Sequence, residues 1–206
     1  TDCRLSGEGI KEAFVKGAMQ AGANVVDCGL ASTPAMFMST VSAPTMASAA
    51  VMVTASHLPF NRNGLKFFTP KGGLDSKDIA AILDIAEKGD YASTKAEGCC
   101  STFDFMTVYS HHLARYIRGG VGSDDYLHPL SGMHIIVDAG NGNGGFFEKV
   151  LRSLGADTTG SQFLDPDGHF PNHIPNPENA DAMASVCKAV VESHADLGVI
   201  FDTDVD

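Results

Sequence analysis

Residues 133–154 read MHIIVDAGNGNGGFFEKVLRSL: an apolar stretch, a glycine-rich segment, and then apolar side chains at helical spacing. Met133 to Val137 has the length and composition of a buried strand, whereas residues 146–154 place their apolar side chains on one face of a helix. A strand that passes through a glycine-rich turn into a helix is a building unit of α/β proteins. These residues therefore predict an α/β fold, in which a further strand-like stretch runs toward Phe163 and Leu164.

The same alternation of helices and strands is expected in the rest of the chain. The spacing of apolar side chains predicts helices over residues 8–22 and 76–88 and from Phe105 onward, and strands over residues 24–26, 49–53 and 197–200. A polar stretch from Gly89 to Thr102 is the expected boundary between two units. The chain is thus predicted to form two consecutive three-layer α/β/α units with mostly parallel mixed sheets, over residues 1–103 and 104–206.

The composition excludes several classes of partner. The apolar stretches are far shorter than the roughly 20 residues of a transmembrane helix, and 44% hydrophobic residues is ordinary for a soluble globular protein. A formal net charge of −11 repels nucleic acid and anionic lipid, so neither is an expected partner. The five cysteines are odd in number and scattered, which predicts reduced thiols and a reducing intracellular compartment.

A candidate nucleophile follows the predicted strand at residues 49–53. The next residues read TASHLP, so Ser56 and His57 lie where that strand ends. A serine hydroxyl is a weak nucleophile and needs a base, a metal ion or a nearby cation, which His57 or Lys66 could supply. The alternative is that this serine and histidine only form a turn.

Three carboxylates alternate after the predicted strand at residues 197–200. They belong to Asp202, Asp204 and Asp206. Crowded like charges are unfavourable without a cation, and ligands that are all oxygen select a hard ion such as Mg²⁺. A calcium loop of the EF-hand kind also starts with alternating acids, but a helix precedes such a loop, whereas a strand precedes this one. A solvated acidic turn is the other alternative.

Other polar segments have plainer interpretations. The glycine-rich segment 138–145 could bind an anion with its backbone N–H groups, although a tight structural turn is the simpler explanation. Prolines break the helix that His169 and His173 would need to bind one metal ion together. Thr33-Pro34 and the segment Arg4 to Gly7 are typical of a helix start and a turn.

Taken together, several strings resemble the α-D-phosphohexomutase superfamily, which includes phosphoglucomutase, phosphomannomutase and phosphoglucosamine mutase. The matching strings are Asp2 to Gly7, Thr33-Pro34-Ala35, Thr54 to His57, Asn63 to Lys66, Asp138 to Gly142, Pro175 to Glu178 and the terminal aspartates. Their order and spacing agree with the family over nearly the whole chain. That agreement is far more specific than any one string.

The resemblance implies a role for each candidate residue. Ser56 resembles the family's phosphoserine, and His57 and Lys66 match positions beside it that assist proton and phosphoryl transfer. The implied Mg²⁺ ligands are Ser56, through its phosphoserine oxygen, Asp202, Asp204 and Asp206.

The implied reaction is a Mg²⁺-dependent intramolecular phosphoryl transfer between hexose 1-phosphate and hexose 6-phosphate. The phosphoserine gives its group to the sugar phosphate, the bisphosphate turns over in the cleft, and the other phosphate returns to the serine. Mg²⁺ and hexose 1,6-bisphosphate are the expected cofactors, and a small sugar phosphate is the expected partner of a monomer or homodimer. Glucose, mannose and glucosamine phosphates all remain open.

Some residues depart from the family pattern. The family usually has asparagine at Leu58 and glycine at Thr203 and Val205. These variants are similar to a plant and algal branch with plastid members, so the cytoplasm and the plastid stroma are both expected locations. A non-catalytic relative that keeps the fold for binding or assembly is the alternative function.

The resemblance also implies missing parts. The family has four domains, with sugar specificity in the third and a phosphate-binding loop in the fourth. The chain is expected to hold the first two only: domain I without its N-terminal strand, and domain II truncated at the metal loop. By itself it is expected to be inactive.

Overall fold

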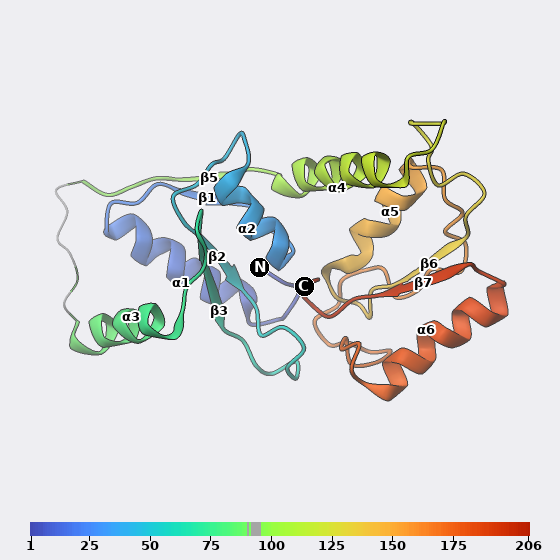
Figure 1. The fold of residues 1–206 in the computed structure, drawn as a ribbon. Helices are drawn as coiled ribbons and strands as arrows, with labels where there is room; N and C mark the ends of the chain where they lie inside the picture. Colours follow the sequence, from blue (N-terminus) through green and yellow to red (C-terminus); the bar gives the residue numbers. More distant parts are fainter. Residues whose placement is uncertain (90, 92–95) are drawn as a thin grey trace.

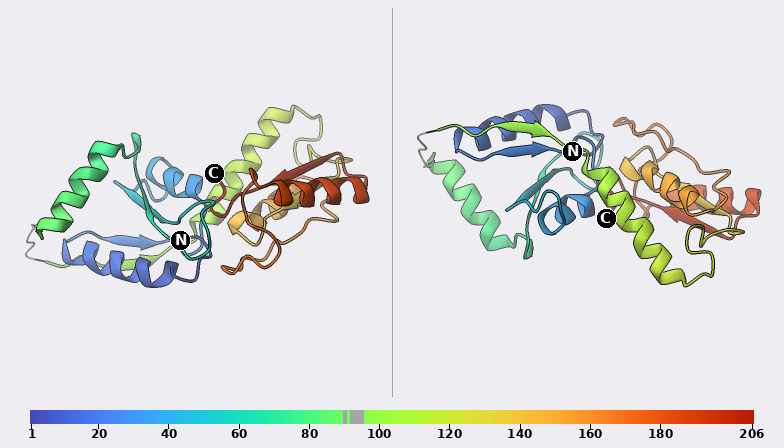
Figure 2. Two further views of the ribbon diagram at one scale, coloured as in Figure 1. Left: turned by 90° about the horizontal axis from the view of Figure 1, so that it is seen from below. Right: turned by 90° about the horizontal axis from the view of Figure 1, so that it is seen from above.

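The structure is a computed structural model that describes residues 1–89, 91 and 96–206. Its elements form two lobes, one from each half of the chain (Figure 1). Helix α4 (Phe105–Val121) leads from the junction of the lobes along the second lobe, and both chain ends lie near that junction (Figure 2). Segments from the two halves of the sequence therefore meet there.

The first lobe contains two separate sheets. Its elements are α1 (Gly7–Gln20), β1 (Val25–Asp27), α2 (Thr33–Val41), β2 (Ala50–Val53), β3 (Leu65–Thr69), β4 (Gly72–Gly73), α3 (Ser76–Lys88) and β5 (Cys100–Thr102). Strands β1 and β5 pair in parallel, whereas β2, β3 and β4 form an antiparallel sheet. β3 returns from β2 through a single loop, and strands joined in this way run antiparallel. Parallel and antiparallel pairing thus both occur, as expected of mixed sheets, although the sheet of β2, β3 and β4 is entirely antiparallel.

The second lobe is built around one parallel strand pair. Its elements are α4, β6 (Ile135–Asp138), a 3₁₀ turn (Asn143–Gly145), α5 (Phe146–Ser153), α6 (Ala180–Ser193) and β7 (Leu197–Ile200). β6 pairs in parallel with β7, and its buried Ile135 and Val137 pack against Val150 and Leu151 of α5. The strand, glycine turn and helix predicted from residues 133–154 are all present, so the α/β class is confirmed.

One local expectation is wrong. The stretch toward Phe163 and Leu164 is not a strand, because it meets β6 only through single bridges at Asp157 and Gln162, and a turn separates the two bridges. The expected boundary, residues 89–102, contributes strand β5 to the first lobe at its end. Residues 90 and 92–95 of that stretch lie outside the described residues.

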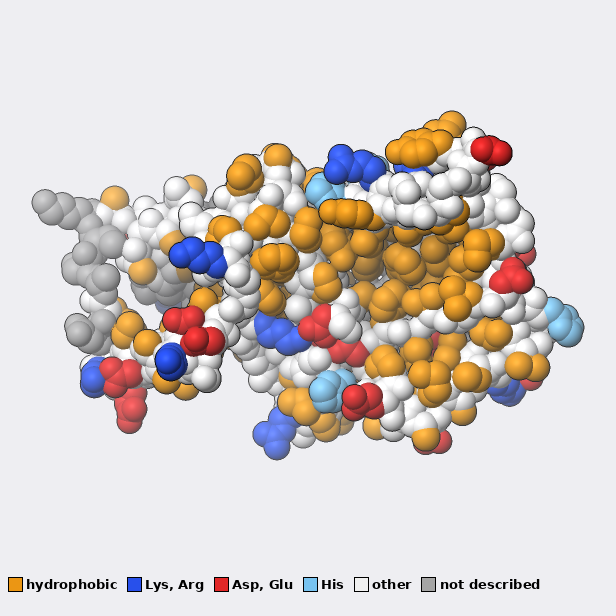
Figure 3. Space-filling view, in the orientation of Figure 1, with side chains coloured by type: hydrophobic (Ala, Val, Ile, Leu, Met, Phe, Trp, Pro, Cys, Tyr) orange, Lys and Arg blue, Asp and Glu red, His pale blue; other side chains and the backbone are white. Residues whose placement is uncertain are grey.

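The surface differs between the junction and the second lobe. Figure 3 shows hydrophobic side chains spread over the second lobe between α4 and the strand pair, and basic beside acidic side chains at the junction. The junction is therefore the place where charged groups from both lobes meet.

In the part of the chain that the structure describes, no helix has the length and hydrophobicity needed to cross a bilayer.

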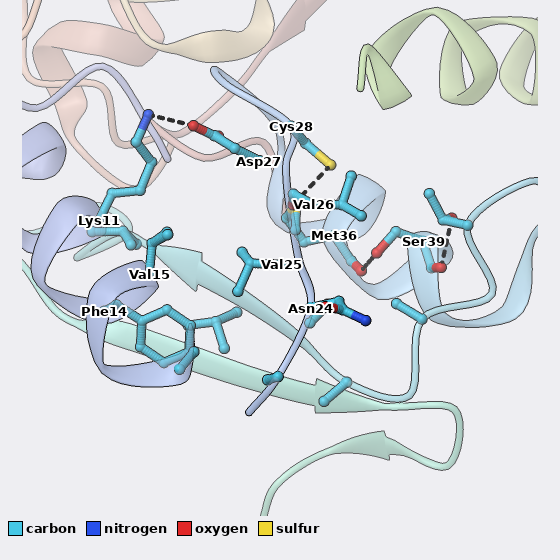
Figure 4. A pocket seen from close by; sticks show the side chains of 18 of the residues that line it. Lys11, Phe14, Val15, Asn24, Val25, Val26, Asp27, Cys28, Met36 and Ser39 are labelled. Carbon is cyan, nitrogen blue, oxygen red and sulfur yellow. Dashed lines mark hydrogen bonds and ion pairs between the residues drawn. The ribbon is translucent and has the colours of Figure 1, made fainter. Parts of the chain in front are cut away.

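An apolar groove of about 670 Å³ separates β1 from β2 (Figure 4). Phe14 and Val15 of α1 and Val25 of β1 line it. At one end of the groove, Thr1 and Asp2 lie between the two sheets. The Thr1 ammonium donates to the Gly29 carbonyl, after β1, at 2.8 Å, and the Asp2 N–H donates to the Val53 carbonyl of β2 at 3.0 Å. Among the described residues, no strand pairs with the β1 and β2 edges along the groove.

A buried ion pair fastens the proline-rich loop to the second lobe. The Nε2 atom of His173 lies 3.0 Å from the nearer oxygen of Asp138, and its Nδ1 atom lies 3.0 Å from the Ile174 carbonyl. Both ring nitrogens thus face acceptors, which a doubly protonated ring satisfies. The hydrogen bond to Asp138 raises the pKa of His173, although burial opposes the charged form. His173 therefore ties the proline-rich loop to Asp138, and the charged form of its ring is the one that this contact favours.

Replacing His173 by glutamine is expected to lower the free energy of unfolding by about 3 kcal/mol at pH 6, because Asp138 loses its charged partner. The pKa of His173 is raised on folding, so its stabilisation is complete below its ordinary value and is lost as the pH rises through the raised value. Urea unfolding should show that the difference in free energy of unfolding between variant and wild type is smaller at pH 9 than at pH 6. The matched control is His169→Gln, which removes an exposed histidine from the same loop. An equal gap at both pH values would contradict the charged pair.

Candidate functional site

Ser56 lies at the junction, in the loop after β2. Its backbone is in the left-handed region with a φ of 53°, and its N–H donates to the Thr54 hydroxyl at 2.9 Å. Its own hydroxyl donates to Asp202 Oδ2 at 2.8 Å. The candidate nucleophile and the first of the three aspartates are thus in contact, although 146 positions separate them in sequence.

The three aspartates form a compact cluster in the loop after β7. One carboxylate oxygen from each of Asp202, Asp204 and Asp206 lies within 4.8 Å of the others. Asp202 and Asp204 are buried, and Asp206 is exposed. No other group of three histidine, cysteine, aspartate or glutamate side chains within the described residues is this close. The cluster thus has the donor atoms of a site for a hard cation.

The charges in the cluster are unbalanced. Burial, with the nearby charge of Asp204, raises the pKa of Asp202 to about 6. Burial also disfavours the charged form of Asp204, but hydrogen bonds from Thr33 and Lys66 outweigh it and lower the pKa of Asp204. The Oδ1 atom of Asp204 is buried without a hydrogen-bond partner. An unpaired buried carboxylate oxygen is unfavourable unless a cation binds it.

Lys66 supplies the positive charge that the cluster does have. It lies on β3 opposite Met52, and its ammonium donates to Asp204 Oδ2 at 2.9 Å and to Asp206 Oδ2 at 2.7 Å. Partial burial alone would lower the pKa of Lys66. Its hydrogen bonds to these two aspartates together have the larger effect, so the pKa of Lys66 is raised. The structure therefore brings Lys66 to the cluster. His57, by contrast, has an exposed side chain beside Ser56, and its role stays a prediction.

Comparison with known proteins identifies the family. The family models named phosphoglucomutase/phosphomannomutase alpha/beta/alpha domain I and domain II match residues 1–93 and 109–206. The chain belongs to the phosphoglucomutase/phosphomannomutase family. A phosphoglucomutase of Neisseria meningitidis serogroup B is 33% identical to it over 206 residues, and a phosphomannomutase/phosphoglucomutase of Pseudomonas putida is 33% identical over 207.

The phosphoglucomutase/phosphomannomutase relatives are longer than this chain. Both alignments cover the whole chain but only 42% and 41% of the respective relatives. A crystal structure of a phosphoglucomutase/phosphomannomutase family protein from Burkholderia thailandensis has a TM-score of 0.80 and 26% identity over 98% of this chain and 43% of that one. The chain thus corresponds to less than half of a phosphoglucomutase/phosphomannomutase polypeptide.

In this phosphoglucomutase/phosphomannomutase chain, Arg4 organises the Ser56 loop from inside. Its side chain is fully buried and forms an ion pair with Asp2, in which Nε lies 3.0 Å from the carboxylate. The remaining guanidinium donors bind backbone carbonyls of the loop: Ser56 at 2.5 Å, Leu58 at 2.7 Å, Pro59 at 2.7 Å and Arg62 at 3.2 Å. Every N–H of the guanidinium has a partner. The sequence had suggested only a turn at Arg4, and the pair Asp2 and Arg4 two positions apart was the available signal.

The aspartate loop is held from both lobes. The Thr33 N–H donates to the Asp204 carbonyl at 2.8 Å, and its hydroxyl donates to Asp204 Oδ2. From the second lobe, the Asn143 N–H donates to the Thr203 carbonyl at 2.8 Å. A side chain at Gly142 would place its Cβ 2.9 Å from the Thr203 backbone, so the glycine permits this approach. In this family member the glycine-rich segment therefore has the structural role of a tight turn against the loop.

Proposed function

We propose that the full-length protein carrying this chain is a Mg²⁺-dependent phosphohexomutase that interconverts hexose 1-phosphate and hexose 6-phosphate through a phosphoserine at Ser56. The observation that carries the proposal is the 2.8 Å contact between the Ser56 hydroxyl and Asp202 inside the acidic cluster. The family membership supports it, because relatives from several bacteria are named phosphoglucomutase or phosphomannomutase. A small sugar phosphate is thus the proposed partner.

The residues of the cluster fit Mg²⁺. Asp202, Asp204, Asp206 and a phosphoserine oxygen at Ser56 would hold the ion, and all of these donors are oxygen. The buried Oδ1 of Asp204 supports this fit, since a cation would satisfy a carboxylate oxygen that has no hydrogen-bond donor. When bound, Mg²⁺ neutralises negative charge on the phosphoryl group in transit.

The chain's own residues supply position and charge for the transfer. In the forward step, a sugar hydroxyl oxygen forms a bond to the phosphorus as the bond from phosphorus to Ser56 Oγ breaks, and the sugar hydroxyl loses its proton. His57, exposed beside Ser56, is the proposed acceptor of that proton. Lys66 adds a positive charge beside the cluster, and Arg4 holds the backbone of the Ser56 loop in place. The second transfer reverses these bond changes with the other phosphate.

The departure at Leu58 leaves the loop intact. Its side chain is half exposed, while its N–H donates to the Ala55 carbonyl and its carbonyl accepts from Arg4 at 2.7 Å. The contacts that shape the loop thus come from backbone atoms, which asparagine or leucine supplies equally. This favours the catalytic function over the non-catalytic alternative, in which the fold serves binding or assembly.

Phosphoryl transfer to Ser56 tests the proposal directly. The full-length protein, incubated with Mg²⁺ and glucose 1,6-bisphosphate, should gain one phosphoryl group, which peptide mass spectrometry should locate on Ser56. Turnover assays with glucose, mannose and glucosamine phosphates would then identify the sugar. Absence of label on Ser56 together with no turnover of any of the three would reject the mutase and favour the non-catalytic relative.

We propose a reducing compartment as the cellular setting of the full-length protein. All five cysteines are free, which fits the reducing cytoplasm or plastid stroma. Whether the full-length protein is a monomer or a homodimer stays a prediction.

A further inference from the structure

The first residue of helix α2 reaches across the junction to the aspartate loop. Thr33 binds Asp204 twice, with its N–H at 2.8 Å from the backbone carbonyl and with its hydroxyl on Oδ2. Thr33 and Asp204 are both buried, and 171 positions separate them in sequence. This double contact joins an element of the first lobe to a loop of the second.

The hydroxyl decides which oxygen of Asp204 is available. Oδ2 accepts from both Thr33 and Lys66, the latter at 2.9 Å. Oδ1 is buried and has no hydrogen-bond partner. A carboxylate whose one oxygen is held by two donors cannot rotate freely, so the orientation of the other oxygen is fixed as well.

Thr33 is the more rigid of the two donors. The Lys66 ammonium ends a flexible side chain, is about one-third exposed and also serves Asp206. Thr33 lies in the first turn of α2, and the Ser32 hydroxyl caps that turn by accepting from the Ala35 N–H at 3.2 Å. A short side chain on a capped helix loses little conformational entropy when it holds a partner.

Helix α2 also connects Asp204 to the serine. The helix packs against β2 and β3, the strands that carry the Ser56 loop and Lys66. The α2 N-terminus carries partial positive charge, which favours the nearby Asp204 carboxylate. A single rigid body thus sets the distance between the nucleophile loop and one aspartate of the cluster.

We propose that Thr33 is a positioning residue for the divalent cation, because its hydroxyl fixes the Asp204 carboxylate and leaves Oδ1 without a hydrogen bond and available to the ion. This rests on the proposed function, since it assumes that the aspartate cluster binds Mg²⁺. Thr33 itself is not a proposed ligand, because its hydroxyl donates to Oδ2 of Asp204 and would act on the ion only through that carboxylate. Removal of such a supporting contact commonly lowers metal affinity by about 10- to 100-fold.

Calorimetric titration of the full-length protein with Mg²⁺ alone tests the inference. Thr33→Val keeps the side-chain shape but removes the hydroxyl, and its Mg²⁺ affinity should fall about 10- to 100-fold. Thr33→Ser keeps the hydroxyl and should bind Mg²⁺ nearly as tightly as wild type. The matched control is Thr40→Val on the same helix, where the lost hydroxyl bonds only the Phe37 carbonyl, and its affinity should not change. In turnover assays, excess Mg²⁺ should restore the rate of Thr33→Val.

The outcomes separate this inference from the function beneath it. If wild type binds Mg²⁺ and Thr33→Val binds it equally well, the positioning role is wrong while the mutase proposal stands. If Thr33→Ser loses as much affinity as Thr33→Val, the hydroxyl is not the cause, and this comparison remains decisive should Thr33→Val fold poorly. If wild type shows no Mg²⁺ binding, both proposals fail together.

Discussion

Turnover of the full-length protein is expected to fall by at least about 10⁴-fold when Ser56 is replaced by alanine, because the group that carries the phosphoryl moiety is gone. The loop itself should survive. Alanine tolerates the left-handed backbone at this position about as well as serine, and the Arg4 contacts are made to backbone carbonyls. The measurement is the conversion of glucose 1-phosphate to glucose 6-phosphate with Mg²⁺ and glucose 1,6-bisphosphate in excess.

A matched serine variant separates chemistry from folding in this experiment. Ser101 lies exposed on β5, so Ser101→Ala should turn over like wild type. Thermal unfolding of both variants should match wild type within a few degrees. If Ser56→Ala converted substrate at the wild-type rate, the serine mechanism would be wrong, whatever the fate of the metal site.

Replacing Arg4 by methionine is expected to lower the free energy of unfolding by about 3–5 kcal/mol. The side chains of Arg4 and Asp2 are both fully buried in their ion pair. Methionine fills similar space but leaves the buried Asp2 carboxylate without its cation. It also removes the donors to four loop carbonyls. Unsatisfied buried acceptors add to the destabilisation, and the Ser56 loop should lose its fixed shape.

Urea unfolding of the full-length protein measures this effect, with activity at low temperature as a second readout. The control is Arg62→Met, because that arginine side chain is exposed in the same loop and only its backbone carbonyl meets Arg4. The double variant Asp2→Asn with Arg4→Met should recover part of the loss, since it removes the unpaired charge. Equal stabilities of Arg4→Met and wild type would show that the guanidinium contacts contribute nothing net.

Local patterns predicted the regular elements well where apolar side chains are large. Helix α3 begins and ends at the expected residues, Ser76 and Lys88, because its spacing and its flanking residues agree. Helix α6, by contrast, was not predicted from the sequence. Its two buried residues, Ala182 and Val186, are small, so their spacing gives a weak signal. Antiparallel pairing of β3 was also missed, since pairing depends on partners outside the local window.

The candidate site divides in the same way. Strand ends rich in hydroxyl and carboxylate groups pointed to Ser56 and the aspartates, because loops after strands collect ligands in α/β proteins. The contacts of Arg4 with the Ser56 loop and of Thr33 with Asp204 were not predictable, since these partners lie 52 and 171 positions away. Such contacts are set by the packing of whole elements, which no local string encodes.

The groove between β1 and β2 has a consequence for the solubility of the protein. Among the described residues these two strand edges are unpaired, and an extended apolar segment of another molecule in the groove could pair with both. These edges are open to a strand of a second molecule, so self-association through sheet edges should grow with protein concentration.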